Sequence, residues 1–95
     1  MFIDFRFFGQ FLAKKRLEAG LSQGALRKVL GYDSPQFISN WERGLCAPPL
    51  KALPDIARAL NIPIEEIVEF LTDETENYLK LNLLPASNRK KKSQK

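Results

Sequence analysis

The segment 21–44, LSQGALRKVLGYDSPQFISNWERG, constrains the fold more than any other part of the chain. A serine stands where it can cap a helix over residues 23–30, and a second serine followed by proline opens another helix over residues 34–43. A glycine follows each helix and can end it in the left-handed conformation. The segment therefore predicts two short amphipathic helices joined by a tight turn.

The second of these helices has two faces of opposite character. Ile38, Trp41 and Leu45 follow the spacing i, i+3, i+7 and are expected to face the core. The opposite face is polar and consists of Gln36, Asn40 and Arg43, with Ser39 at its edge. A helix that buries one stripe and exposes amide and guanidinium groups on the other is suited to lie in a DNA groove.

A first helix is expected from Asp4 or Phe5 to Ala19, with Asp4 as its N-cap. Its inner stripe consists of Phe5, Phe8, Leu12 and Arg16. Phe2 and Phe7 exceed what one helical face can bury, so they either pack on the core or meet a second chain. The core is the preferred interpretation, because a small domain needs every apolar contact.

The spacing of the apolar residues and the positions of the prolines also predict the bounds of the remaining helices. Helix 23–30 is expected to bury Ala25, Leu26, Val29 and Leu30. After a single turn at 50–53, a fourth helix runs from Leu53 or Pro54 to Leu60 and buries Ile56, Ala57 and Leu60. A fifth begins near Pro63 and turns Ile64, Ile67, Val68 and Leu71 inward. Residues 73–84 can form a short sixth helix, which is marginal alone.

Composition narrows the classes of function. The chain of 95 residues has the length of one small domain, and it contains no histidine and a single cysteine, Cys46, expected to be half-buried. Neither a catalytic site nor a metal site is expected, because the commonest general base is absent and the acidic residues at 65–76 lack the spacing of an EF-hand loop. The sequence therefore predicts a protein that is not an enzyme and needs no cofactor.

The apolar start, MFIDFRFF, contains Asp4 and Arg6 and lacks a basic leading region, so it does not resemble a signal peptide. No apolar stretch is long enough to span a membrane. These features predict a cytoplasmic protein without a membrane partner.

Charge is distributed unevenly along the chain. Residues 1–64 carry nine basic and five acidic side chains, residues 65–84 carry six acidic and one basic, and residues 85–95 carry five basic and no acidic ones. A positive body suits a protein that presents one face to an anion. The tail 85–95 is expected to be disordered. It can lie along a DNA backbone, fold back on the acidic segment, or serve only as a solubilising end.

Residues 8–71, about two thirds of the chain, resemble the XRE-type helix-turn-helix domains of the phage lambda-repressor and Cro proteins. Three motifs carry the resemblance: GLSQ at residues 20–23, Ile-x-x-Trp-Glu-Arg-Gly at residues 38–44, and ALNIP at residues 59–63. The resemblance implies an all-α, compact five-helix domain, in which the helix ending at Arg43 lies in the major groove and the preceding helix crosses the DNA backbone.

The resemblance also implies roles for individual residues. Base contacts fall on Gln36, Ser39 and Asn40, and phosphate contacts on Gln23, Arg43 and Lys28. Amide side chains can pair bidentately with adenine, whereas the alternative for each of these residues is a solvated surface position. Gln23 would also support the second helix of the motif. Arg16 and Glu42 match a structural salt bridge inside the family fold.

Two features depart from the family pattern. Tyr32 and Asp33 stand between the glycine and the serine of the turn, where the family usually has one residue, so the turn is longer. Pro35 occupies a position that often carries a base-reading side chain, and proline offers no hydrogen-bond donor.

These observations predict three regions: a helix-turn-helix domain at 1–71 with a Phe-rich N-terminal extension, a short extension at 72–84, and the basic tail at 85–95. The expected function is that of a transcriptional regulator, a repressor, which binds a double-stranded DNA operator as a homodimer. The Phe-rich extension and the segment 73–84 are the candidate dimer surfaces. The alternative is an antitoxin or adaptor module that uses the same fold mainly to bind a protein partner.

Overall fold

The computed structural model describes residues 4–85 of the chain. Five α-helices and one 3₁₀ turn make up this part: α1 (Phe5–Glu18), α2 (Gln23–Leu30), α3 (Gln36–Glu42), η1 (Leu50–Ala52), α4 (Leu53–Leu60) and α5 (Ile64–Leu83). The prediction of an all-α five-helix domain is confirmed. Phe2 and most of the basic tail lie outside the described residues.

Local capping chemistry sets most helix ends where the sequence predicts them. The Asp4 carboxylate accepts a hydrogen bond from the backbone N–H of Arg6, and the Ser22 hydroxyl accepts one from Ala25. Gly31 ends α2 with a φ of 81°. Helix α3 begins at Gln36, one residue after the predicted first position, Pro35, and the Ser34 hydroxyl accepts from the Gln36 N–H, as a serine that caps this helix would.

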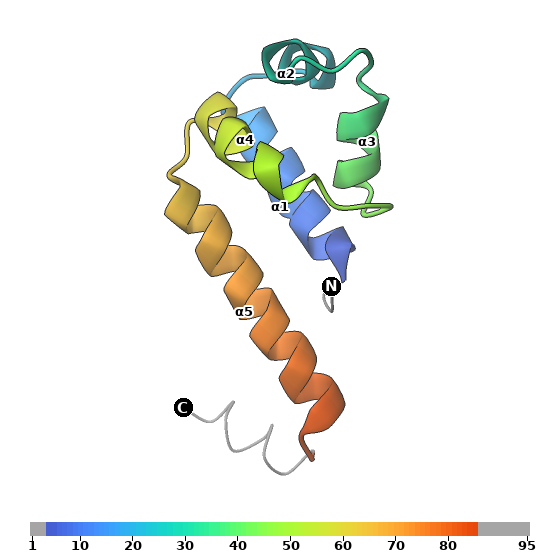
Figure 1. Ribbon diagram of the computed structural model, residues 1–95, viewed down its shortest axis with the longest axis vertical. Helices are drawn as coiled ribbons and strands as arrows, with labels where there is room; N and C mark the ends of the chain where they lie inside the picture. The colour runs from blue at the N-terminus through green and yellow to red at the C-terminus, as the bar shows by residue number, and fades with distance from the viewer. Residues whose placement is uncertain (1–3, 86–95) are drawn as a thin grey trace.

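The core lies where α1, α3, α4 and the first half of α5 converge (Figure 1). Three isoleucines at its centre, Ile38, Ile56 and Ile67, are almost completely buried. The other buried apolar residues are Phe8, Leu12, Leu26, Trp41, Leu53, Ala57 and Leu60. Apolar residues from all five helices therefore build one core, which fixes α2 and α3 relative to the rest of the domain.

A glycine brings α1 directly against the end of α3. A Cβ atom placed on Gly9 would overlap the backbone carbonyl oxygens of Trp41 and Glu42. The absence of a side chain at this position lets the last turn of α3 rest on the backbone of α1. Gly44, with a φ of 75°, makes a second close approach, to the backbone of Arg6.

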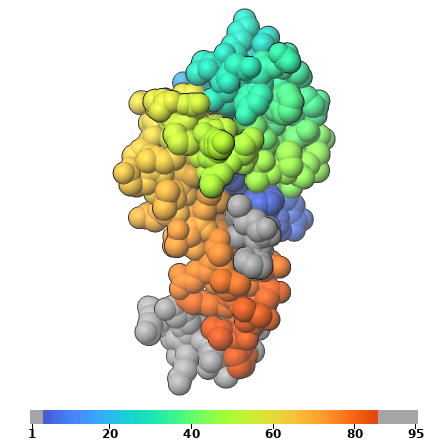
Figure 2. Space-filling view, in the orientation of Figure 1, coloured from blue at the N-terminus to red at the C-terminus, as the bar shows by residue number. Residues whose placement is uncertain are grey.

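Helix α5 is a single helix of 20 residues, and the predicted separate helix at 73–84 is its second half. The sequence contains no glycine or proline between Ile64 and Leu83, so nothing interrupts the backbone hydrogen bonds there. Lys15 of α1 holds the first turn of α5 through an ion pair with Glu66 at 2.7 Å. Figure 2 shows the second half of α5 projecting from the base of the body.

Some residues expected in the core are exposed instead. Phe7 lies beside the buried stripe of α1, and Val29 lies on a helix whose single buried residue is Leu26. Leu45 follows Gly44, whose left-handed backbone breaks the helical spacing that placed Leu45 inward. Val68 and Cys46 are exposed as well, so the predicted burial of both was wrong.

Candidate nucleic-acid interface

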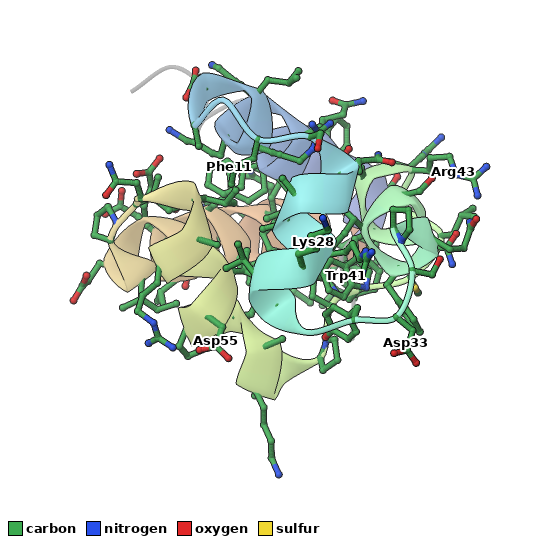
Figure 3. All side chains as sticks on the ribbon, turned by 90° about the horizontal axis from the view of Figure 1, so that it is seen from above. Phe11, Lys28, Asp33, Trp41, Arg43 and Asp55 are labelled. Atoms are coloured by element: carbon green, nitrogen blue, oxygen red, sulfur yellow. The ribbon has the colours of Figure 1, made fainter. Side chains whose placement is uncertain are left out.

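The exposed face of α3 carries a row of connected polar side chains. The Gln36 amide nitrogen donates to Asn40 Oδ1 at 2.8 Å, and an Arg43 guanidinium nitrogen donates to the same oxygen at 3.2 Å. Asn40 therefore lies between the two other side chains and orients both. Arg43 points away from the body, whereas Trp41 lies on the inner side of the helix (Figure 3). We call Gln36, Ser39, Asn40 and Arg43 the reading face.

The other predicted contact residues lie around this face. Within the reading face Ser39 is half-buried, and outside it Lys28 is exposed on α2. Gln23 occupies the first position of α2, and its amide nitrogen donates to Glu42 Oε1 at 2.9 Å. The structure therefore brings Gln23 to the inner side of α3.

Behind the reading face, a charged network joins three helices. Arg16 of α1 forms two hydrogen bonds with Glu42 of α3, with Nε 2.6 Å from Oε2 and Nη2 3.1 Å from Oε1. A third donor of Arg16 bonds the carbonyl oxygen of Leu21 at 2.8 Å. The Arg16 and Glu42 side chains are only 11% and 8% exposed. Because Gln23 bonds the same carboxylate, the network fixes α2 and α3 relative to α1.

The lengthened turn between α2 and α3 is held by aromatic packing and by Arg27. Tyr32 donates its backbone N–H to the Arg27 carbonyl at 2.9 Å, and the Arg27 guanidinium donates to the Tyr32 carbonyl at 3.1 Å. The Tyr32 ring meets the edge of Trp41 at 5.4 Å and stacks on Phe37 at 5.0 Å between ring centroids. The sequence did not lead us to predict these contacts. The aromatic residues near the turn in the sequence, Tyr32 and Phe37, form the pattern from which these contacts could have been predicted.

Strong pKa shifts occur away from the reading face. A hydrogen bond from the Arg6 side chain lowers the pKa of Asp4 to about 2, and the hydrogen bond to Glu66 raises the pKa of Lys15. Both pairs stabilise α1 at its end or against α5. They supply no acid–base chemistry to the reading face.

Within residues 4–85 no group of three or more histidine, cysteine or carboxylate side chains gathers in a way that could hold a metal ion. None of the helices in this part of the chain combines the length and the apolar character needed to cross a membrane.

Comparisons with known proteins place the chain among helix-turn-helix proteins. Residues 12–67 match a family described as Helix-turn-helix (HTH_3). The restriction-modification controller protein C.AhdI from Aeromonas hydrophila is 34% identical with a TM-score of 0.61, over 67% of this chain and 96% of that one. The clp gene regulator ClgR from C. glutamicum is 22% identical with a TM-score of 0.60, over 67% of this chain and 82% of that one. No curated protein sequence matches the chain.

Proposed function

Because the chain belongs to the helix-turn-helix family of DNA-binding domains, we propose that it is a sequence-specific regulator of transcription, a repressor that acts in the cytoplasm. In this proposal α3 lies in the major groove of a double-stranded operator. The similarity to a restriction-modification controller protein supports a regulatory role.

The reading face is the observation that carries the proposal. Its amide groups stand on the exposed side of a helix whose other side is fixed by Ile38, Trp41 and the Arg16–Glu42 pair. The major groove is wide enough for one helix, and amide side chains pair with adenine through a donor and an acceptor. In this proposal Gln36, Ser39 and Asn40 contact base edges.

The phosphate contacts proposed for Gln23, Lys28 and Arg43 flank these base contacts. Gln23 donates one amide N–H to Glu42, and a second N–H remains for a phosphate oxygen. It also lies at the start of α2, where the helix dipole favours an anion. Lys28 and Arg43 are exposed and carry positive charge.

A binding selection from random duplex DNA at a stated salt concentration tests the proposal. We expect the protein to enrich one palindromic sequence, because two copies related by a two-fold axis would read two half-sites. Binding that remains sequence-blind and depends only on salt would contradict the proposal and favour the antitoxin or adaptor alternative.

Replacement of Arg43 by alanine should weaken operator binding and reduce the slope of log K against log salt by about one unit, because one phosphate contact is lost. Titrations at several salt concentrations measure this slope. Arg58→Ala is the matched control: it removes the same charge from α4, next to Asp55, on the side of the molecule opposite Arg43 (Figure 3). Equal slopes for the two variants would contradict a phosphate contact at Arg43.

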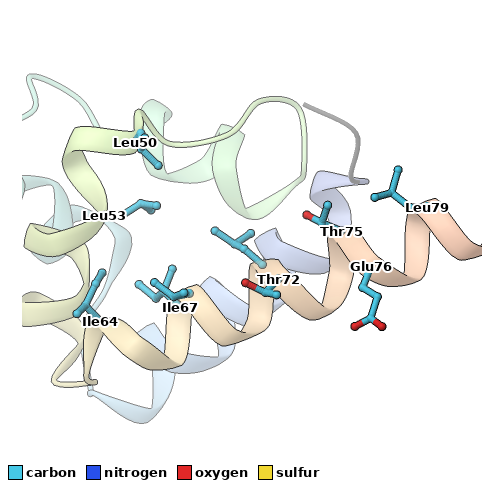
Figure 4. Close-up of a pocket in the computed structure, with 10 residues that line it drawn as sticks. Leu50, Leu53, Ile64, Ile67, Thr72, Thr75, Glu76 and Leu79 are labelled. Atoms are coloured by element: carbon cyan, nitrogen blue, oxygen red, sulfur yellow. The ribbon is translucent and has the colours of Figure 1, made fainter.

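We further propose that the protein acts as a homodimer that forms along α5. An open groove of about 620 Å³ runs between η1, α4 and α5, and apolar side chains line most of it. Figure 4 shows Thr75 and Leu79 of α5 on the same side of the helix, facing the region where Leu50 and Leu53 lie. Val68 is exposed at this groove.

A second copy suits the groove because α5 itself offers a matching surface. Val68, Leu71, Thr75 and Leu79 follow a spacing of three or four residues, which forms one continuous stripe on a helix. The threonine leaves room for a close approach between two helices, and the leucines can fill the space beside it. Two antiparallel α5 helices would therefore cover each other's stripe.

Val68→Glu should weaken self-association by about tenfold or more, because it places a charge in the apolar stripe that the partner's α5 would cover. Sedimentation equilibrium measures the monomer–dimer constant without DNA. Leu17→Glu, an equivalent change at an exposed apolar residue of α1, should leave the constant unchanged. A wild-type chain that stays monomeric at all concentrations would contradict the dimer and leave the DNA-binding proposal intact.

A further inference from the structure

An exposed phenylalanine lies next to the reading face. Phe37 is 47% exposed, although an apolar ring of this size normally packs inside a small domain. It follows Gln36 directly and precedes Asn40 by three residues, so it is a neighbour of Asn40 on the helix surface. An aromatic ring therefore borders the amide groups of α3.

The surrounding structure holds this ring in one place. Its inner side stacks on Tyr32 with an interplanar angle of 29°, and Tyr32 meets the edge of the buried Trp41. Arg27 bonds the backbone of Tyr32 at both its N–H and its carbonyl, so Tyr32 itself is fixed. Tyr32, one of the two residues of the longer turn, therefore lies between the buried Trp41 and the exposed Phe37 and holds the Phe37 ring in place.

We infer that Phe37 is a specificity-determining residue that contacts the 5-methyl group of a thymine beside the bases read by Gln36 and Asn40. The inference rests on the proposed function. The thymine methyl is the one methyl group on the major-groove edges of the four bases, so it is the DNA group best matched to a fixed apolar ring at the reading face. Pro35, at the start of α3, offers no hydrogen-bond donor to a base. An apolar contact from Phe37 would therefore add specificity at the end of the helix where a polar contact is missing.

A substitution in the DNA tests this contact without altering the protein. In the operator recovered by selection, each thymine is replaced in turn by deoxyuridine, which lacks only the methyl group. We expect one position per half-site at which wild-type binding weakens about fourfold, the value for one lost buried methyl group. Phe37→Ala should bind the unmodified operator about tenfold more weakly. It should show no further loss at the deoxyuridine position.

Two further variants separate this contact from general effects. Leu17→Ala removes an apolar side chain from α1 that is 66% exposed, and it should keep both the wild-type affinity and the sensitivity to deoxyuridine. Phe37→Leu keeps an apolar side chain and should retain part of the sensitivity. Thermal melts of each variant confirm that the domain remains folded.

The outcomes distinguish the inference from the function on which it rests. If no operator emerges from the selection, the proposed function fails. If an operator emerges but no deoxyuridine position weakens binding, or if Phe37→Ala keeps the wild-type sensitivity, the thymine contact is refuted and the function stands. Unchanged operator affinity in Phe37→Ala also overturns the inference.

Discussion

Replacement of Glu42 by alanine should lower the free energy of unfolding by about 3–5 kcal/mol, the usual cost of removing one partner from a buried ion pair. Arg16 would keep its charge in a site where its side chain is 11% exposed, and only the Leu21 carbonyl would remain as a partner. Gln23 would also lose the acceptor that ties α2 to α3. The variant should therefore be partly or fully unfolded near the growth temperature of a mesophile.

Thermal and urea denaturation followed by circular dichroism measure this loss. Glu69→Ala is the matched control, because Glu69 is an exposed carboxylate on α5 with the same charge. An unchanged midpoint for Glu42→Ala would show that the pair contributes nothing measurable to stability.

A double variant distinguishes two contributions to the loss of stability: the cost of leaving Arg16 without a partner, and the loss of the ion pair itself. Arg16→Met combined with Glu42→Met removes both charges and fills their space with apolar side chains. Replacement of a buried ion pair in this way is often neutral or stabilising. We therefore expect the double variant to be more stable than Glu42→Ala alone, and the difference would measure the cost of leaving Arg16 unpaired.

Asn40→Ala should weaken binding to the selected operator by about 10- to 100-fold, within the range of one lost bidentate base contact. Asn40 would lose its own contact with a base. It would also cease to orient its neighbours, since Gln36 and Arg43 both donate to its side-chain oxygen. For the same reason Gln36→Ala should cost less than Asn40→Ala, and the two losses should not add.

Equilibrium titrations with the operator and with a scrambled duplex measure these effects. The loss should appear on the operator and be small on the scrambled duplex, because base contacts carry specificity and phosphate contacts do not. Asn77→Ala, which removes an exposed amide from α5, is the control. An Asn40→Ala variant that binds the operator within twofold of wild type would show that this amide is merely solvated.

Local chemistry explains why much of the fold could be predicted from the sequence. The bounds of α2 follow from Ser22 and Gly31, and those of α4 follow from the position of Pro54 and the end of the apolar spacing at Leu60. Capping and terminating residues act within a few positions along the chain, so they can be recognised without tertiary information. The Arg16–Glu42 pair came from the family resemblance, and the structure places its atoms within hydrogen-bonding distance.

Long-range packing explains what could not be predicted. Helical spacing identified the inner stripe of α5 but not whether another element covers all of it, so Val68, which borders the open groove, was wrongly assigned to the core. The contact of Tyr32 with Phe37 depends on the path of the turn, which sequence spacing does not define. The DNA contacts themselves remain predictions.

The glycine contact between α1 and α3 has a consequence for how the protein would meet DNA. Because the last turn of α3 rests on the backbone at Gly9, no side chain separates the two backbones at that point and could yield to let the helix tilt. Any misfit between the protein and a curved or narrowed groove would therefore have to be relieved by bending the duplex. Since flexible base steps bend at lower cost than stiff ones, we expect this rigidity to make the protein sensitive to base pairs that it never touches.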